Sequence, residues 1–197
     1  MSAIAVETLK DRAARAAAID DLARLRIAVF REWPYLYDGS LDYERRYLAH
    51  FLEDSDAALI VARAGDAIVG AATASPMSGQ DAAFRIPFEE RGHDVARLFY
   101  LGESVLLPDY RGHGIGHGFF DAREAAARAA GAQAACFCGI VRPADHPLRP
   151  AEARDLGPFW RARGYAPVEG VMARYDWKDI DQPEETSHPM QFWHRTL

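Results

Sequence analysis

One glycine-rich segment has residue types and a spacing that suit the binding of a ligand better than any other part of the chain. Its sequence is Arg111-Gly112-His113-Gly114-Ile115-Gly116. It lies between an apolar run and an alanine-rich run, so it is predicted to join a strand to a helix. Glycine lets a ligand approach the backbone closely, and a helix N-terminus presents N–H groups at the positive end of its dipole. The segment therefore predicts a binding site for an anion.

The spacing of these glycines excludes two common nucleotide-binding loops. A dinucleotide-binding fingerprint needs glycines at i, i+2 and i+5, but His117 and Phe119 occupy the third position of the two registers that could begin here. A P-loop ends in Gly-Lys-Ser/Thr, and the lysines of this chain, Lys10 and Lys178, are far from the turn. Neither a Rossmann site nor a nucleoside triphosphatase is predicted.

Other side chains with metal-binding or nucleophilic groups are less informative. His113 and His117 are separated by glycines, which argues against a metal site, and no metal is predicted. Cys136 and Cys138 lie two residues apart in an apolar run, too close for a framework disulfide. They are predicted to be reduced and buried strand residues, with no base paired to them that would make a nucleophile.

Hydrophobic periodicity and capping residues predict the elements that position the turn. The expected helices are one of about three turns from an Asp20 cap, one from a Ser40 cap to about residue 54, and others at 115–130 and 155–163. The expected strands are 3–9, the hairpin 57–62 and 67–73, then 98–107, 134–141 and 168–177. We expect a single domain over residues 1–197, with an insertion at about 76–96 and a C-terminal tail at about 179–197. The tail turns apolar at Met190, so it should dock on its own domain or on a neighbouring subunit.

Composition limits the classes of partner. The chain has 197 residues, 49% of them hydrophobic and 26% charged, which is typical of a globular domain. A net charge of −6 argues against general binding to nucleic acid or anionic lipid and favours a cationic or neutral partner. The sequence shows no signal peptide and no apolar run of about 18 residues, so a cytoplasmic protein without a membrane partner is expected.

The segment from Leu106 to Gly116 resembles the pyrophosphate loop of the GNAT superfamily of N-acetyltransferases. That loop has the pattern Arg/Gln-x-x-Gly-x-Gly/Ala after a strand ending in hydrophobic-x-Pro, here Leu106-Leu107-Pro108 followed by Arg111 to Gly116. The order of the expected elements is similar as well. A second segment also resembles a family sequence, aromatic-Tyr-x-x-x-Gly-Phe; here it reads Phe159-Trp160-Arg161-Ala162-Arg163-Gly164-Tyr165. The resemblance covers roughly residues 3 to 178.

The resemblance implies an α/β (α+β) fold: a mixed, mostly antiparallel sheet, splayed between the strands at 98–107 and 134–141 and flanked by helices. Acetyl-CoA, as the acyl donor, would lie in the gap. The backbone of Leu106 and Leu107 would contact the pantetheine arm. The pyrophosphate would be held by the residues of the turn: Arg111, Gly112, His113, Gly114, Ile115 and Gly116.

The resemblance also directs attention to an acid–base group. An alkyl ammonium must lose a proton before it can attack a thioester, at a cost on the order of 4 kcal/mol at neutral pH. Glu103, in an otherwise apolar strand, is the candidate base, with a purely structural carboxylate as the alternative. The family's usual proton donor to the departing thiolate is a tyrosine, but Trp160 stands at that position. Tyr110 and Tyr175 are substitutes without positional support.

The sequence thus predicts an N-acetyltransferase that transfers an acetyl group to a primary amine of a small molecule or peptide. Aromatic residues in the loop after the first helix, Trp33, Tyr35 and Tyr37, would contact the acceptor. A non-catalytic acyl-CoA-binding module, suggested by Trp160, and a transferase for a longer acyl group remain alternatives. A homodimer is left open.

Overall fold

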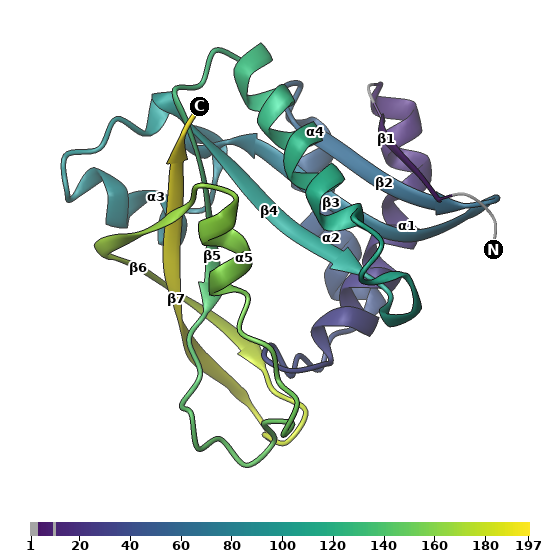
Figure 1. The fold of residues 1–197 in the computed structure, drawn as a ribbon, viewed down its shortest axis with the longest axis vertical. Helices are drawn as coiled ribbons and strands as arrows, with labels where there is room; N and C mark the ends of the chain where they lie inside the picture. Colours follow the sequence, from purple (N-terminus) through teal and green to yellow (C-terminus); the bar gives the residue numbers. More distant parts are fainter. Residues whose placement is uncertain (1–3, 10) are drawn as a thin grey trace.

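The structure, a computed structural model, describes residues 4–9 and 11–197. Its centre is a seven-stranded sheet in the order β1-β2-β3-β4-β5-β7-β6, in which only β4 and β5 are parallel neighbours (Figure 1). The strands are β1 (Ile4–Leu9), β2 (Ala58–Ala64), β3 (Ala67–Pro76), β4 (Leu98–Leu106), β5 (Ala134–Ile140), β6 (Ala166–Lys178) and β7 (Glu185–Thr196). The helices are α1 (Arg12–Phe30), α2 (Leu41–Glu53), α3 (Ala82–Glu89), α4 (Ile115–Ala129) and α5 (Gly157–Ala162).

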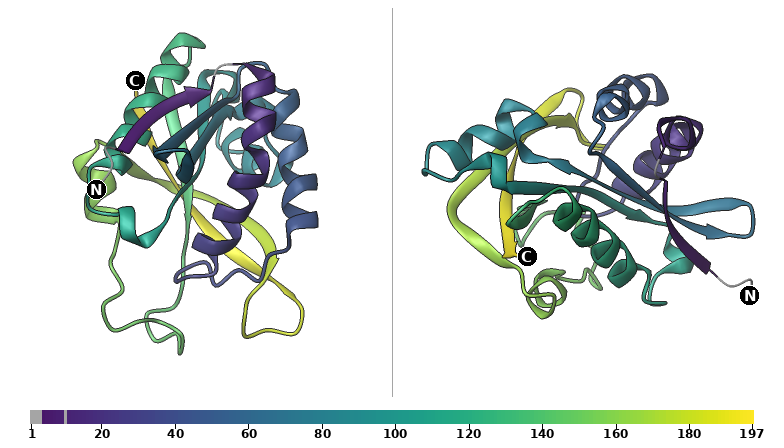
Figure 2. Two further views of the ribbon diagram at one scale, coloured as in Figure 1. Left: turned by 90° about the vertical axis from the view of Figure 1, so that its right-hand side faces the viewer. Right: turned by 90° about the horizontal axis from the view of Figure 1, so that it is seen from above.

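The helices cover both faces of the sheet. Helices α1 and α2 lie on one side and α4 and α5 on the other, as the view from above shows (Figure 2). Apolar side chains of α1 pack on β2 and β3, and those of α4 pack on the opposite face of the same strands. None of the helices in residues 4–9 and 11–197 combines the length and apolarity that a membrane span requires. The mixed, mostly antiparallel and helix-flanked sheet is the fold class expected from the sequence.

Strands β4 and β5 separate soon after they begin. They pair in parallel only from Leu98 to Tyr100 on β4 and from Ala134 to Cys136 on β5. Beyond that point β4 continues along β3, whereas β5 continues along β7. The sheet therefore opens between its two central strands, at the position the sequence predicted, and Figure 1 shows the two strands diverging.

A bulge in β4 decides which way Glu103 points. The register runs from Ala74 opposite Leu101 to Ala72 opposite Ser104, so Gly102 and Glu103 together oppose the single residue Thr73. A side chain at position 102 would collide with Thr73, since an added Cβ would lie 2.4 Å from its Oγ1. An extra residue reverses the alternation of faces. Leu101 accordingly packs on the α4 side, while Glu103 faces α1.

Helix α1 begins earlier than the Asp20 start that the sequence predicted. Its N-cap is Asp11, whose side chain accepts the N–H of Ala14 at 2.7 Å. The added turns contain mostly alanine and arginine, which favour helix by propensity rather than by an apolar stripe. One of these arginines, Arg15, is buried and donates to the carbonyls of Asp54 and Ala57, at 3.0 and 2.6 Å.

The predicted tail is instead part of the sheet. Residues 185–196 form β7, which lies between β5 and β6 and is antiparallel to both. Phe192 is completely buried there, and Met190 and Trp193 are also buried. The first half of β7 pairs only with β6, in a ribbon that extends beyond β5, which explains why its residues are polar. The segment expected to be an insertion contains a short helix, α3, from Ala82 to Glu89.

Candidate active site

A cavity of about 100 Å³ opens where β4 and β5 separate. Glu103 lies on its wall, and Tyr35 and Tyr37 reach it from the loop after α1. Trp33, the third aromatic residue expected at the acceptor, does not line the cavity and packs against His146 instead. The other lining residues are Arg26, Phe30, Tyr43, Tyr47, Phe84, Tyr100, Gly102, Cys138, Tyr175, Trp177 and Met190.

Glu103 belongs to a buried network of charges. The guanidinium of Arg26, on α1, lies 2.8 Å from Glu103 Oε2 and 2.5 Å from Oε2 of Glu44, on α2. Burial alone would lower the pKa of Arg26, but the carboxylates of Glu103 and Glu44 outweigh it and raise that pKa. Glu103 is thus fixed through one oxygen, while Oε1 accepts no hydrogen bond from the described residues. An oxygen in this position is available to a ligand.

The aromatic wall is uncharged. Burial raises the pKa of Tyr47 to about 12 and also raises the pKa of Tyr35, Tyr37 and Tyr175. These residues therefore offer neutral hydroxyl groups and ring faces at physiological pH. Burial likewise raises the pKa of the Cys138 thiol, to about 12. That thiol lies 3.2 Å from the hydroxyl of Tyr100 across the beginning of the gap.

The glycine-rich turn has the geometry of an anion cradle. Gly112 and Gly114 have φ angles of 83° and 79°, which disfavour other residues, and nothing lies within 4 Å of an added Cβ at either position. The N–H groups of residues 112–116 donate to no backbone carbonyl among the described residues. They stand just before and within the first turn of α4, where a helix attracts negative charge. The residues present therefore fit a bound pyrophosphate.

The neighbouring residues differ in how well they fit the expected contacts. Leu107 uses both of its backbone groups within the protein, since its N–H donates to Val69 and its carbonyl accepts from Tyr110, both at 3.0 Å. The Leu107 N–H is therefore not free for a ligand, but its carbonyl oxygen can accept a second hydrogen bond, so the expected backbone contact between Leu107 and pantetheine stays a prediction. Because N–H groups alternate in direction along a strand, that of Leu106 points away from β3, toward the gap. Arg111 pairs with Glu32 at 2.9 Å and donates to the Leu106 carbonyl at 3.1 Å.

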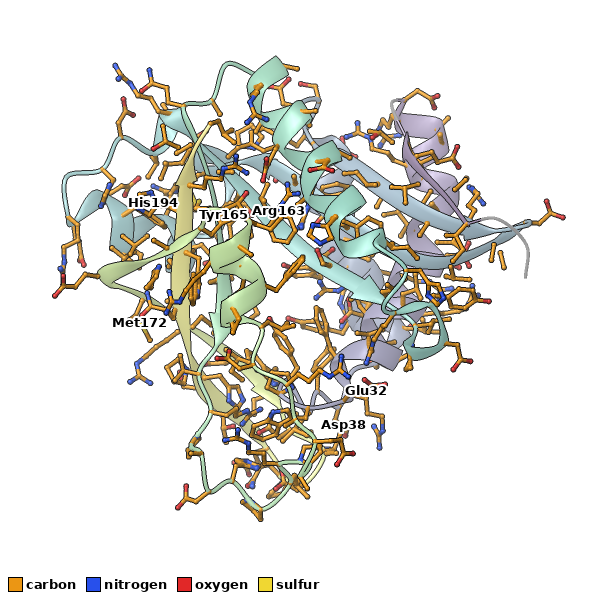
Figure 3. All side chains as sticks on the ribbon, in the orientation of Figure 1. Glu32, Asp38, Arg163, Tyr165, Met172 and His194 are labelled. Carbon is orange, nitrogen blue, oxygen red and sulfur yellow. The ribbon has the colours of Figure 1, made fainter. Side chains whose placement is uncertain are left out.

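Trp160 stands at the position of the expected proton donor. Trp160 packs on β5 beside Gly139, and Tyr165 donates to Glu124 at 3.1 Å, beside α4 together with Arg163 (Figure 3). Of the two substitutes, Tyr175 lines the cavity but Tyr110 does not. The part of the chain that the structure describes contains no group of histidine, cysteine and acidic side chains that could hold a metal ion.

A model of the acetyltransferase (GNAT) family matches residues 22–157. The chain belongs to this family. The match spans the elements from α1 to the start of α5, including β4, the glycine-rich turn and the opening of the sheet. The protein is thus a GNAT acyltransferase, in a family that uses acetyl-CoA as the acyl donor.

Solved structures share the GNAT fold at low sequence identity. A ribosomal-protein-alanine N-acetyltransferase from Brucella melitensis is 14% identical, with a TM-score of 0.63, and covers 98% of this chain and 99% of its own. A protein from Salmonella typhimurium, solved with its cofactor acetyl-CoA, is 13% identical with a TM-score of 0.58, covering 100% and 95%. An N-acetyltransferase from Thermoplasma acidophilum, in complex with coenzyme A, is 12% identical with a TM-score of 0.57, covering 98% and 99%. No match is found among curated protein sequences.

Several residues of this GNAT site were not singled out from the sequence. The sequence signal for Arg26 is a charged residue within the apolar stripe of α1, four positions after Leu22 and three before Val29. Tyr43 and Tyr47 had another, since residues four apart share a helix face, and their rings stack with centroids 6.4 Å apart. No feature of the sequence singles out Glu44, because an acidic residue in the first turn of a helix is ordinarily explained by the helix dipole.

Proposed function

We propose that this protein transfers the acetyl group of acetyl-CoA directly to a primary amine of a small molecule or peptide, with Glu103 as the general base. The observation that carries the proposal is the position of Glu103. It lies on the cavity wall where β4 leaves β5, with one carboxylate oxygen held by Arg26 and the other unoccupied by the described residues. A base must lie within hydrogen-bond reach of the proton that it removes, directly or through one water.

The proposed step is a single displacement. The nitrogen of the amine forms a bond to the thioester carbonyl carbon, the carbon–sulfur bond breaks, and coenzyme A leaves as the thiolate. The proton that the amine loses goes to Glu103, directly or through water. The conjugate thiol has an ordinary pKa of about 8.5, so the coenzyme A thiolate can leave without a proton donor from the protein and then take a proton from water. This route needs no acidic hydroxyl at position 160, where this chain has Trp160.

Different residues would bind the donor and the acceptor. The turn from Arg111 to Gly116 would hold the pyrophosphate through its unpaired N–H groups, and Leu106 would offer its backbone to the pantetheine arm. Tyr35 and Tyr37 would contact the acceptor from the loop after α1. Arg142 supports that loop, because its guanidinium donates to the carbonyls of Pro34 and Tyr35 at 2.8 and 2.7 Å.

Glu103→Gln tests the base. The glutamine keeps the shape of the side chain but cannot accept the proton, so thiol release with a confirmed acceptor should fall by about 10²-fold or more. The acidic limb of the pH–rate profile should flatten. Affinity for acetyl-CoA, measured by calorimetry, should remain near that of the wild type, because Glu103 is not part of the glycine-rich turn.

The matched control is Glu53→Gln. Glu53 is a surface glutamate whose ion pair with Arg12, at 2.7 Å, is solvent-exposed. Removing that pair should leave turnover unchanged, since exposed ion pairs contribute little. Wild-type turnover in Glu103→Gln would assign Glu103 a purely structural role. Binding of acetyl-CoA without thiol release from any amine would instead support the non-catalytic alternative.

A further inference from the structure

A second, larger cavity joins the one beside Glu103. It has a volume of about 380 Å³ and extends to Asp54, at the end of α2, and to Asp81, at the start of α3. The two cavities share lining residues at the Glu103 end, so they adjoin there. The shared residues are Tyr47, Phe84, Tyr100, Gly102, Glu103 and Tyr175.

The charges that line the second cavity all have one sign. Asp54, Asp81 and Glu103 face it, and no arginine or lysine among the described residues does. Arg26 borders only the first cavity, where its charge is already matched by two carboxylates. The rest of the wall is uncharged: it consists mainly of aromatic rings and neutral polar groups, together with Leu48 and two glycines. Carboxylates and aromatic ring faces both attract cations.

The two aspartates at the far end have unused oxygens. Asp54 Oδ1 accepts the N–H of Asp56 at 2.9 Å, and Asp81 Oδ1 accepts the N–H of Ala83 at 2.8 Å. The Oδ2 atoms accept no hydrogen bond from the described residues, and that of Asp54 lies 3.7 Å from a Cβ added at Gly79, on the adjoining cavity wall. Each aspartate can thus bind a ligand without giving up its structural hydrogen bond.

Helix α2 sets the distance between the two ends. Tyr47 marks the Glu103 end, because its ring lies 4.6 Å from the guanidinium of Arg26, which holds Glu103. Asp54 follows Tyr47 by seven positions along the same helix. At a rise of roughly 1.5 Å per residue, Asp54, the C-cap of α2, lies about 10 Å along the helix axis from Tyr47, and this rise sets the scale of its separation from the proposed base.

We infer that the acceptor is an elongated amine with a second cationic group, which Asp54 and Asp81 bind about 10 Å from the nitrogen that is acetylated. This inference rests on the proposed function, in which that nitrogen lies next to Glu103. An apolar chain between the two amines would pack against Phe84 and the tyrosine rings, which removes its surface from water. An anionic acceptor would meet only repulsion in this cavity.

The test compares three acceptors of one chain length in a thiol-release assay with acetyl-CoA: α,ω-diaminooctane, octylamine and ω-aminooctanol. The diamine should have a kcat/KM at least tenfold above the other two, which corresponds to about 1.4 kcal/mol. In the double variant Asp54→Asn, Asp81→Asn, KM for the diamine should rise about tenfold with kcat unchanged, while octylamine is unaffected. Asparagine preserves both structural hydrogen bonds, because its side-chain oxygen also accepts.

Asp56→Asn is the matched control, since it removes the same charge two residues from Asp54, outside the cavity. Equal kcat/KM for all three acceptors, or an equal effect of the double variant on all three, would overturn the inference.

Calorimetry of α,ω-diaminooctane with the protein–coenzyme A complex separates the two proposals. Binding that weakens about tenfold in the double variant supports the cation site even without turnover, whereas absence of thiol release counts against the proposed function. Binding that is unchanged in the variant overturns the cation site.

Discussion

Single residues of the glycine-rich turn expose the backbone that would bind the donor. Gly114 has a φ of 79° and open space at its Cβ position, so a side chain there would strain the backbone and cover its N–H groups. Gly114→Val should weaken acetyl-CoA binding at least tenfold in calorimetry, about 1.4 kcal/mol. Gly92→Val is a matched control, because Gly92 also has a positive φ, 75°, and open space, but lies outside the turn. Equal loss of affinity in both variants would show that backbone strain alone is responsible.

The cysteine in the cavity provides a second test at this scale. Because burial raises the pKa of Cys138 to about 12, the side chain is a thiol at pH 8 and a poor nucleophile. Iodoacetamide should label it far more slowly in the folded protein than in urea. The folded rate should rise about tenfold per pH unit as the thiolate fraction grows. Incubation with acetyl-CoA alone should leave the protein mass unchanged, and an acetylated Cys138 would contradict direct transfer.

Glu103 and the glycine-rich turn could be predicted because each breaks a local pattern. The formation of a strand does not explain an acidic residue among apolar ones, and the formation of a helix does not explain glycines at its start, so both indicate a further role. Arg26, which fixes Glu103, lies 77 positions away in the sequence, and only the packing of α1 against β4 brings the two together. A single sequence contains no direct signal for such a contact. That Trp33 does not line the cavity could not be predicted for a related reason, since aromatic residues of one loop can face different neighbours.

At the scale of elements, capped and strongly periodic segments were predictable. The Ser40 cap of α2 is confirmed, as is the hairpin of β2 and β3, whereas the start of α1 and the whole of β7 were missed. Helix α1 begins in a region without an apolar stripe. Strand β7 begins in a polar ribbon and contains Pro189, so only its second half looks like a buried strand. The β4 bulge also escaped prediction, although Gly102 marks the residue that must approach Thr73.

Strand β7 gives an element-scale prediction about stability. Phe192 is completely buried between the insertion and the sheet, with its ring centroid 4.7 Å from that of Phe88. Phe192→Ala should lower the free energy of unfolding by about 3–5 kcal/mol, measured with urea. Met172→Ala, on the neighbouring strand, is the control, because Met172 is 37% exposed and its loss should cost about 0.5 kcal/mol or less. A small effect at Phe192 would mean that β7 is not part of the cooperative core.

For the molecule as a whole, the opening between β4 and β5 brings the proposed donor and acceptor sites together. The glycine-rich turn follows the end of β4, and the acceptor cavities lie beside the bulge in the same strand. Side chains of α1 and α2 line the cavities. These two helices lie on one face of the sheet, whereas α4, which follows the turn, lies on the other (Figure 2). The net charge of −6 agrees with the acidic lining of the second cavity, which favours cationic acceptors.

The order of strands has a consequence for how the chain folds during its synthesis. Strands β1 to β4 pair with sequence neighbours, so this half of the sheet can assemble while a nascent chain is still being extended. On the other side of the opening, β5 and β6 are joined only through β7, which the ribosome makes after both of them. Until residues 185–196 emerge, β5 and β6 each expose an unpaired edge. The wall of the opening that faces β4 is therefore completed only after β7 has been made, later than the half of the sheet that carries the glycine-rich turn.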